Sequence, residues 1–416
     1  MITRGKAGDS VQAAFILQEG VADPHARDFT AGQLDQASRI GDQLTGFIDA
    51  AQFSLHMAIY DFRLDGAAAD KVIGALNAKA EAGVTVRIAY FQPPRQPTPE
   101  AFALLGSDPA QLDDGLALGA QKLHERVQVK PIKQDPNLHP LAPPVQGEAI
   151  NAPHNLMHSK YIVRDGITPR AAVLMGSANF TTDAWAVQDN NILVFDPCPD
   201  LARYYENDFG EMWQTEQISN TGNFDTGSVE VGGIAVQVLF APGRGRQIGA
   251  EIASRIDVAE KRLLIASMDI SSGPILGAIA DRMHRVTTFA GIYDGPQMHL
   301  VLQEWEKSKG AATGAAGNAS RRRAGASAGK ATQFEQIAEF LHYKKSLPFK
   351  SAGVHNFMHN KFAVVDDTVI TGSFNFSTNA QRNAENVVIV ESTDLADAYA
   401  DYANALIAKY TDTGVD

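Results

Sequence analysis

The chain has 416 residues, of which 44% are hydrophobic and 20% are charged, an ordinary globular composition. Its net charge of −12 argues against a protein that binds nucleic acid over its whole surface, but leaves room for a local basic groove. The single cysteine, Cys198, excludes an internal disulfide and a metal site built from cysteines alone. We find neither an apolar run approaching the roughly 18 residues of a membrane span nor a signal peptide. We therefore expect a cytoplasmic protein, although a protein secreted without a cleavable signal would look the same.

The sequence consists of two similar halves. Isoleucine and leucine recur at helical spacing over residues 40–48, and isoleucine does so again over residues 248–256. Each of these predicted helices is followed by a β-rich run and then by another helix and strand. Strands that alternate with helices favour parallel α/β layers. We predict a first domain over residues 1–220 and a second over residues 221–416, with the boundary in a segment rich in Gly, Ser, Thr and Asn.

Two features distinguish the second half. Its net charge is −2, against −10 for the first half, so a polyanionic partner should favour it. Residues 310–330 are mostly Gly, Ala, Ser and Asn, and they contain three consecutive arginines. Because this composition offers few side chains for a core, it predicts a mobile loop.

A short motif with a histidine and a lysine occurs once in each half. It reads His-x-Lys-x4-Asp and spans residues 158–165 and 359–366. Since the run is β-prone, the histidine and the lysine two positions later point to the same side of a strand. The aspartate falls at odd spacing, at the end of the strand. We expect Asp165 and Asp366 to fix a turn there rather than to act in catalysis.

The next strand carries a second polar set. The run Gly-Ser-x-Asn at residues 176–179 recurs at residues 372–375, and its serine and asparagine share one face. A carboxylate follows in each half, Asp189 in the first and Glu385 in the second. Such a group could accept a proton from Nδ1 of a histidine, which would fix the tautomer and leave Nε2 free to react.

Each half therefore offers an imidazole, an ammonium group, a hydroxyl and a carboxamide to one place. This combination suits a phosphate, whose oxygens need positive charge and hydrogen-bond donors. A single histidine on an apolar strand is usually structural, but two copies of the set in one order are hard to assign to packing. No metal-ligand spacing occurs, so we expect no metal and no other cofactor. The candidate catalytic residues are His158, Lys160, Ser177, Asn179 and Asp189 in the first half, and His359, Lys361, Ser373, Asn375 and Glu385 in the second.

The duplicated motif resembles that of the phospholipase D superfamily, in which His-x-Lys-x4-Asp is followed by Gly-Ser-x-Asn. The resemblance covers nearly the whole chain. The first copy departs from the second by a longer gap between Asp165 and Gly176, and by Asp189 in place of a glutamate. The resemblance implies an α/β fold of two similar α-β-α sandwich domains, packed as a pseudo-twofold bilobal unit with one active site between them. It also implies a phosphohistidine intermediate and no metal. Because both motifs lie in one chain, a monomer suffices.

The roles of the two histidines follow from the chemistry only in part. A phosphodiester has a poor leaving group, so one imidazole must attack while the other, protonated, donates to the departing oxygen. Residue type does not decide between them, because the two motifs are so similar. By resemblance, several members of the superfamily attack with the first-motif histidine, which makes His158 the nucleophile and His359 the acid and base. The two carboxylates would orient the imidazoles, and the lysines and asparagines would hold the phosphoryl oxygens.

The substrate stays open, because the superfamily includes lipid-headgroup hydrolases and transferases as well as nucleases. The second motif resembles the bacterial nuclease branch most, so we expect nucleic acid; the basic residues near it could instead be a solvated surface. The alternative is a phospholipase D or phosphatidyltransferase that acts on phospholipid headgroups. An inactive binding scaffold is disfavoured, since neither motif has lost its histidine. Candidate substrate-binding residues are His154, His355, Arg321, Arg322, Arg323, Lys344 and Lys345.

Overall fold

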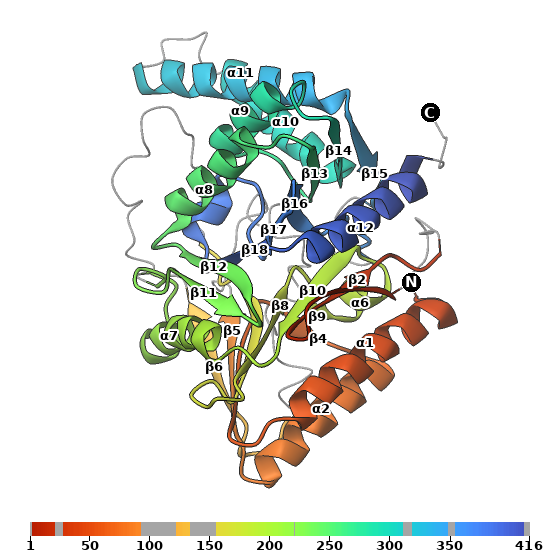
Figure 1. Ribbon diagram of the computed structural model, residues 1–416, viewed down its shortest axis with the longest axis vertical. Helices are drawn as coiled ribbons and strands as arrows, with labels where there is room; N and C mark the ends of the chain where they lie inside the picture. Colours follow the sequence, from red (N-terminus) through yellow and green to blue (C-terminus); the bar gives the residue numbers. More distant parts are fainter. Residues whose placement is uncertain are drawn as a thin grey trace.

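The computed structural model describes residues 2–20, 28–92, 122–133, 155–219, 221–310, 318–347 and 354–411. Within these residues each half builds an eight-stranded sheet, and the strand order is the same in both (Figure 1). The first sheet has the order β1 (Ile2–Ala7), β2 (Val11–Ile16), β10 (Asn190–Phe195), β8 (Ala172–Gly176), β7 (Lys160–Arg164), β3 (Ser54–Ile59), β5 (Thr85–Gln92) and β6 (Gln128–Lys133). The second has the order β11 (Gly227–Val231), β12 (Ile234–Ala241), β18 (Glu385–Glu391), β17 (Thr368–Gly372), β16 (Lys361–Val365), β13 (Arg262–Ser267), β14 (Thr288–Asp294) and β15 (Leu341–Lys344).

Both sheets are mixed, so the expected parallel pairing is found in one part of each sheet. In the first sheet β3, β5 and β6 run parallel, and the other neighbours are antiparallel. The second sheet repeats this pattern. The motif strand β7 and its successor β8 are joined by a connection too short for a parallel crossover, so they form an antiparallel pair. A small parallel pair, β4 (Phe62–Arg63) with β9 (Phe180–Thr181), lies beside the first sheet's helices.

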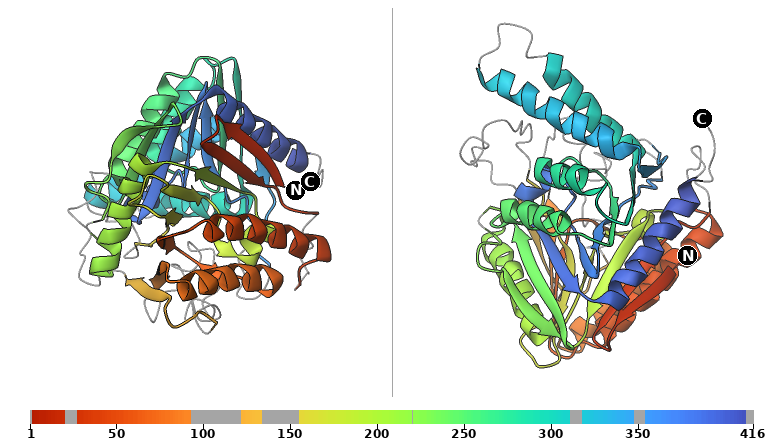
Figure 2. Two further views of the ribbon diagram at one scale, coloured as in Figure 1. Left: turned by 60° about the horizontal axis from the view of Figure 1, so that its bottom comes forward. Right: turned by 45° about the horizontal axis from the view of Figure 1, so that its top comes forward.

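Helices cover the outer face of each sheet. The first sheet packs against α1 (Ala31–Asp49), α2 (Gly66–Glu81) and the short α6 (Thr182–Ala186). The second packs against α8 (Gly245–Asp257), α9 (Gly273–Arg282), α10 (Gly295–Gly310) and α11 (Asn318–Ala338), and a 3₁₀ turn, η1 (Asn379–Arg382), lies beside α8. These helices form the two outer layers in Figures 1 and 2.

The two helices predicted from apolar spacing are α1 and α8. Helix α1 begins at a capping box, in which the Thr30 hydroxyl accepts the N–H of Gln33 and the Gln33 side chain accepts the N–H of Thr30. Its Ile40, Leu44 and Ile48 are buried against the first sheet. The matching residues of α8 are buried against the second sheet. The repeat in the sequence is therefore a repeat of one helix-on-sheet packing.

A middle layer joins the halves. It consists of α7 (Pro199–Thr215) and α12 (Thr393–Thr411), each of which contacts strands of both sheets. Each helix carries a tyrosine that packs edge-to-face on the opposite half: Tyr205 on Phe240 at 5.0 Å, and Tyr399 on Phe15 at 4.8 Å between ring centroids. These residues belong to one buried core that takes side chains from both halves. The two sheets, and the motifs on them, are thus held in a fixed relation.

The prediction of a mobile loop over residues 310–330 is wrong for residues 318–330, which form the first part of helix α11. Residues 311–317 lie outside the described residues. The segment is helical because alanine and arginine are among the strongest helix formers, and because the later turns of the helix supply buried Phe334 and Ile337. The three arginines at 321–323 belong to this helix. Among the described residues, no helix is both long and apolar enough to cross a membrane.

Candidate active site

The two motifs meet where the sheets face each other. The N–H of His158 donates to the carbonyl of Ala384 at 2.9 Å, and the N–H of His359 donates to the carbonyl of Asp189 at 3.0 Å. Each bond belongs to an isolated parallel β-bridge, between Met157 and Ala384 in one case and between Met358 and Asp189 in the other. The main chain before each histidine is therefore fixed by the opposite half of the chain.

The rings of the two histidines have different partners. Nδ1 of His158 lies 2.9 Å from both carboxylate oxygens of Glu385. Nδ1 of His359 lies 3.0 Å from the amide oxygen of Asn190. The amide nitrogen of Asn190 donates to the carbonyl of Ala184 at 3.1 Å, which turns its oxygen toward the ring. An acceptor at Nδ1 favours a proton there and leaves Nε2 as the reactive nitrogen of both rings.

Asp189 was predicted to orient an imidazole, and this prediction is wrong by one residue. Its carboxylate accepts hydrogen bonds from Lys344, Tyr410 and the main chain of Gln18, and its neighbour Asn190 takes the position of Glu385. The reason is a loop that is one residue longer in the first half, as the packing of Gly176 on the Asn191 carbonyl and of Gly372 on the Asn386 carbonyl shows. Aligning the pair Asn-Asn with the pair Glu-Asn would have revealed the correct partner.

The serines of Gly-Ser-x-Asn support the partners of the histidines. The Ser177 hydroxyl donates to the Asn190 amide oxygen at 2.9 Å. The Ser373 hydroxyl accepts the N–H of Asn386 at 3.1 Å and hydrogen-bonds to Glu385. Neither serine was predicted in this role, because the sequence did not show that the polar set of one half would serve the histidine of the other.

Both motif lysines are buried, with 1% of each side chain exposed. Burial lowers the pKa of Lys160 to about 7. Burial together with the nearby charge of Lys160 lowers the pKa of Lys361 well below its ordinary value. Each ammonium group donates to the carbonyl of its own motif histidine, and that of Lys160 also lies 4.9 Å from the Tyr60 ring. Two cations held close together out of water favour the binding of an anion.

The same environment acts on the other titratable groups. Burial and the charges of both lysines lower the pKa of His158 and of His359 well below the ordinary range. Burial raises the pKa of Glu385 to about 8, against the attraction of the lysines. Since both lysines influence both histidines, the four side chains form a single cluster. Without a bound anion, the imidazoles are neutral at neutral pH.

The two motif asparagines are the most accessible of the predicted catalytic side chains. Asn179 and Asn375 are partly exposed, whereas the histidines are 7% and 5% exposed. The amide oxygen of each asparagine is buried and has no hydrogen-bond partner within the part of the chain that the structure describes. A ligand that enters between the motifs would meet these amides.

Asp165 and Asp366 occupy turns at the ends of the motif strands, with positive φ values of 53° and 50°. The carboxylate of Asp165 accepts N–H groups of residues 52–54, the shortest of these bonds being 2.7 Å. That of Asp366 accepts N–H groups of residues 260–262, the shortest being 2.6 Å. Both carboxylates thus tie the turn to the start of the neighbouring strand.

The predicted substrate-binding lysines differ sharply. Lys344 is 1% exposed, and its ammonium group lies 2.7 Å from the Asp189 carboxylate. The prediction that it contacts nucleic acid is therefore wrong, because the charge is buried and already paired. Lys345, one position later on the alternate face of the strand end, is exposed. Of the three arginines, the structure describes only the helical main chain.

Of the second predicted histidine pair, the structure describes His355. His355 is 5% exposed, its Nδ1 lies 3.5 Å from the Asp183 carboxylate, and its ring stacks on Phe357. His154 lies outside the described residues. In the described ranges, no three or more His, Cys, Asp or Glu side chains are grouped so as to hold a metal ion.

Comparison with known proteins fits this geometry. The family model described as "Cardiolipin synthase, PLD-like domain" matches residues 44–213 and 252–407, one segment in each half. The chain belongs to the phospholipase D-like family. The crystal structure of phosphatidylserine synthase from Haemophilus influenzae Rd KW20 is 13% identical, with a TM-score of 0.55 over 92% of this chain and 88% of that chain. This likeness shows that the PLD-like bilobal fold is shared over nearly the full length.

Relatives in sequence match over shorter segments. A phospholipase D from Rickettsia bellii (strain RML369-C) is 56% identical over 43 residues, which make up 10% of this chain and 21% of the relative. A mitochondrial cardiolipin hydrolase from Xenopus laevis is 46% identical over 61 residues, or 12% of this chain and 29% of the relative. The chain thus spans less than a third of the length of these relatives.

Proposed function

We propose that this PLD-like protein is a phosphodiesterase that acts through a phosphohistidine intermediate and needs no metal. The observation that carries the proposal is the pair of buried histidines, each bound at Nδ1 by an acceptor from the opposite half. Both rings lie beside the two motif lysines. Such a site supplies a nucleophile, an acid and the positive charge that a phosphoryl group requires.

In the first step, Nε2 of His158 attacks phosphorus and the bond to the leaving oxygen breaks. The imidazole gains positive charge, which lowers the pKa of Glu385 at Nδ1 from about 8, and the resulting carboxylate stabilises the positive ring. The departing oxygen takes a proton from His359. The negative charge of the bound phosphodiester raises the pKa of His359 from its low value in the free site, so the ring can carry that proton.

In the second step, water attacks phosphorus and the bond from phosphorus to Nε2 of His158 breaks. His359, now neutral, takes the proton of the water and is ready to donate again. Its partner, the uncharged amide of Asn190, stabilises a positive ring less than a carboxylate would, so proton release stays easy. Lys160, Lys361, Asn179 and Asn375 would hold the phosphoryl oxygens in both steps.

Nucleic acid is the first candidate substrate. Two observations support it. The second motif resembles that of the bacterial nuclease branch, and the second half of the chain has a near-neutral charge and carries exposed Lys345 and the arginines of α11. Lys345, next to the buried Lys344 at the end of β15, would contact the phosphate backbone.

A phospholipid is the second candidate, because an apolar trough reaches the catalytic cluster. It has a volume of about 580 Å³ and runs between α1 and the outer face of the first sheet. Its walls include Leu44 and Phe47 from the helix and Ile192 from β10, and Lys160 lies among its lining residues. A trough of this size and character would accept a hydrocarbon chain next to the phosphate.

The proposal is tested by incubating the protein in EDTA, in parallel, with single-stranded DNA, duplex DNA, RNA and phosphatidylcholine vesicles. The control is the double variant His158→Ala/His359→Ala. We expect cleavage of nucleic acid that survives the chelator and is absent in the control. Faster cleavage of vesicles than of any nucleic acid would favour the lipid. Complete loss in EDTA, restored by Mg²⁺ but not by spermidine, would contradict the mechanism.

A further inference from the structure

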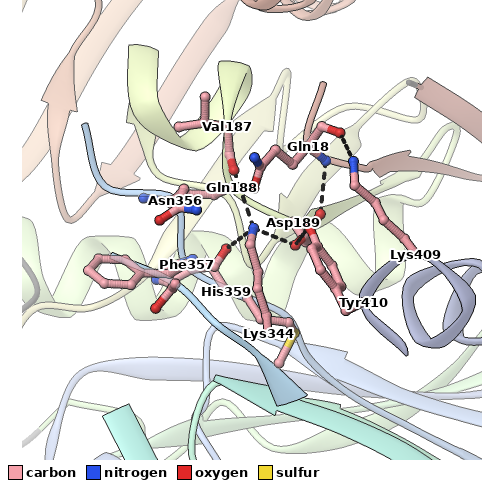
Figure 3. A network of polar contacts seen from close by, with 12 residues as sticks. Gln18, Val187, Gln188, Asp189, Lys344, Asn356, Phe357, His359, Lys409 and Tyr410 are labelled. Atoms are coloured by element: carbon pink, nitrogen blue, oxygen red, sulfur yellow. Dashed lines mark hydrogen bonds and ion pairs between the residues drawn. The ribbon is translucent and has the colours of Figure 1, made fainter. Parts of the chain in front are cut away.

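We infer that Asp189 and Lys344 form a buried ion pair that positions His359 and not His158. This inference rests on the proposed function, in which His359 transfers the protons. The ammonium nitrogen of Lys344 lies 2.7 Å from Oδ2 of Asp189, and the two side chains are 1% and 0% exposed (Figure 3). Neither residue belongs to the His-x-Lys-x4-Asp or Gly-Ser-x-Asn motif.

The Asp189 carboxylate accepts hydrogen bonds from three other segments of the chain. Oδ1 accepts the N–H of Gln18, just after β2, at 2.8 Å. Oδ2 accepts the hydroxyl of Tyr410, near the end of α12, at 2.8 Å, in addition to Lys344. The carboxylate thus anchors the start of β10 to both halves of the molecule (Figure 3).

The main chain of Asp189 holds the peptide units on both sides of Met358. Its N–H donates to the carbonyl of Phe357 at 3.1 Å, and its carbonyl accepts the N–H of His359 at 3.0 Å. Lys344 donates to the same Phe357 carbonyl at 3.3 Å. The next residue, Asn190, supplies the acceptor for the His359 ring. A shift of Asp189 would therefore move the main chain and the ring partner of His359 together.

The other half provides an internal comparison. There Ala384 forms the same two main-chain bonds, to the Leu156 carbonyl at 2.8 Å and from the His158 N–H at 2.9 Å. An alanine has no carboxylate, so the ion pair has no counterpart beside His158. His158 is instead bound directly by a carboxyl group, at both oxygens of Glu385. The ion pair thus accompanies the histidine whose own partner is a neutral amide.

Stability alone is a weak reason for such a pair. The free energy lost when two charges leave water is often as large as the free energy gained from their attraction. Apolar residues of similar volume therefore often stabilise a core equally well. A positional role explains why the carboxylate is held from three different segments and why the lysine reaches the Phe357 carbonyl. Asp189 and Lys344 are therefore positioning residues and do not touch the reacting atoms.

The test separates the two chemical steps with a bis-nitrophenyl phosphodiester, whose leaving group needs no proton. In Lys344→Met and Asp189→Asn, we expect a burst of nitrophenol, from attack by His158, within about threefold of wild type. The rate at which the adduct is hydrolysed should fall roughly 10–100-fold, the usual effect of replacing a residue that orients a functional side chain without touching the substrate. Acid-quenched mass spectrometry should show the adduct accumulating on His158.

Two further variants keep the test decisive. Tyr410→Phe removes one bond to Asp189 and leaves the ion pair intact, so no buried charge loses its partner. This variant should fold and should shift the ratio of burst to steady-state rate in the same direction, by less. Glu206→Gln disturbs a partly buried pair away from the two motifs, in which His56 Nδ1 lies 2.7 Å from the Glu206 carboxylate, with 13% and 15% of the side chains exposed. This control should lower the melting temperature and leave that ratio unchanged.

Equal loss of burst and steady-state rate in the Asp189, Lys344 and Tyr410 variants would overturn the inference, and so would an unchanged ratio. Either result, with a wild-type adduct on a histidine, would leave the proposed function standing. A wild-type protein that cleaves the substrate without any histidine adduct would instead refute the proposed function itself.

Discussion

His158 and Glu385 lie in opposite halves of the chain, yet Nδ1 of the histidine is 2.9 Å from each oxygen of the glutamate. The other motif histidine has an amide in the corresponding place. A carboxylate stabilises an imidazole that becomes positive, whereas an amide only orients it. The two motifs are too similar to show which histidine attacks. The different partners of their Nδ1 atoms support attack by His158.

The partner of His158 can be tested directly. Glu385→Gln keeps an acceptor near Nδ1 but removes its charge, so formation of the phosphohistidine should slow roughly 10–100-fold. Asn190→Asp, the matched change beside the other ring, should leave adduct formation nearly unchanged. Rapid-quench measurement of the nitrophenol burst distinguishes these outcomes. An equal effect of both substitutions on the burst would argue against different roles for the two rings.

Substitution of each histidine tests its proposed role directly. His158→Ala should abolish any covalent adduct, because no second nucleophile is proposed. His359→Ala should still form the adduct with a nitrophenyl phosphodiester and then stall, because no base remains to activate water. Acid-quenched mass spectrometry locates the adduct. An adduct on His359 in the wild type would reverse the assignment.

Binding of an anion should weaken as the pH rises. The pKa of Lys160 is about 7 in the free site, so this cation is charged below that pH and neutral above it. Glu385, with a pKa of about 8, adds negative charge in the same direction. We expect the dissociation constant for sulfate, which stays a dianion, to rise by up to ~10-fold per pH unit above about pH 7. Calorimetry would measure it, and Lys160→Met should bind more weakly with a shallower slope. A constant affinity from about pH 6 to 9 would mean that Lys160 keeps its charge.

Asp165 should matter for stability more than for chemistry. Asp165 is 3% exposed and its side chain accepts N–H groups of residues 52–54, so Asp165→Ala removes the acceptor that holds these three main-chain donors. We expect a loss of about 1–3 kcal/mol in the free energy of unfolding, with kcat little changed. Asp366→Ala should cost less, because that carboxylate is half-buried. Urea denaturation with parallel activity measurements would check this. A loss of kcat in a stably folded Asp165→Ala would point to a part in catalysis.

Much of the fold and of the site could be predicted from the sequence, because the patterns that indicate them occur in both halves. The apolar spacing that places α1 and α8 occurs in both halves, and so do the motif strands. Alternation along a strand was enough to put His158 and Lys160 on one side. These are local properties, which a short stretch of sequence determines.

The errors concern relations between distant segments. Asn190 was missed because a one-residue difference in a loop shifts the alignment of the halves, and no local rule exposes it. Lys344 looked like a surface cation because its partner Asp189 lies 155 positions away in the chain. The start of α11 looked like a linker because its packing against α9 depends on side chains one and two turns later.

The exchange of partners between halves has a consequence for how such a protein can evolve. Two identical subunits related by a twofold axis would have to give both histidines the same neighbour, since any change in one copy appears in the other. Joining the copies in one chain removes that constraint. Here one ring has a glutamate and the other an asparagine, and only one side carries the Asp189 anchor. Fusion thus lets the two halves differ, and in the proposed mechanism the pseudosymmetric pair of histidines divides the work of a single reaction.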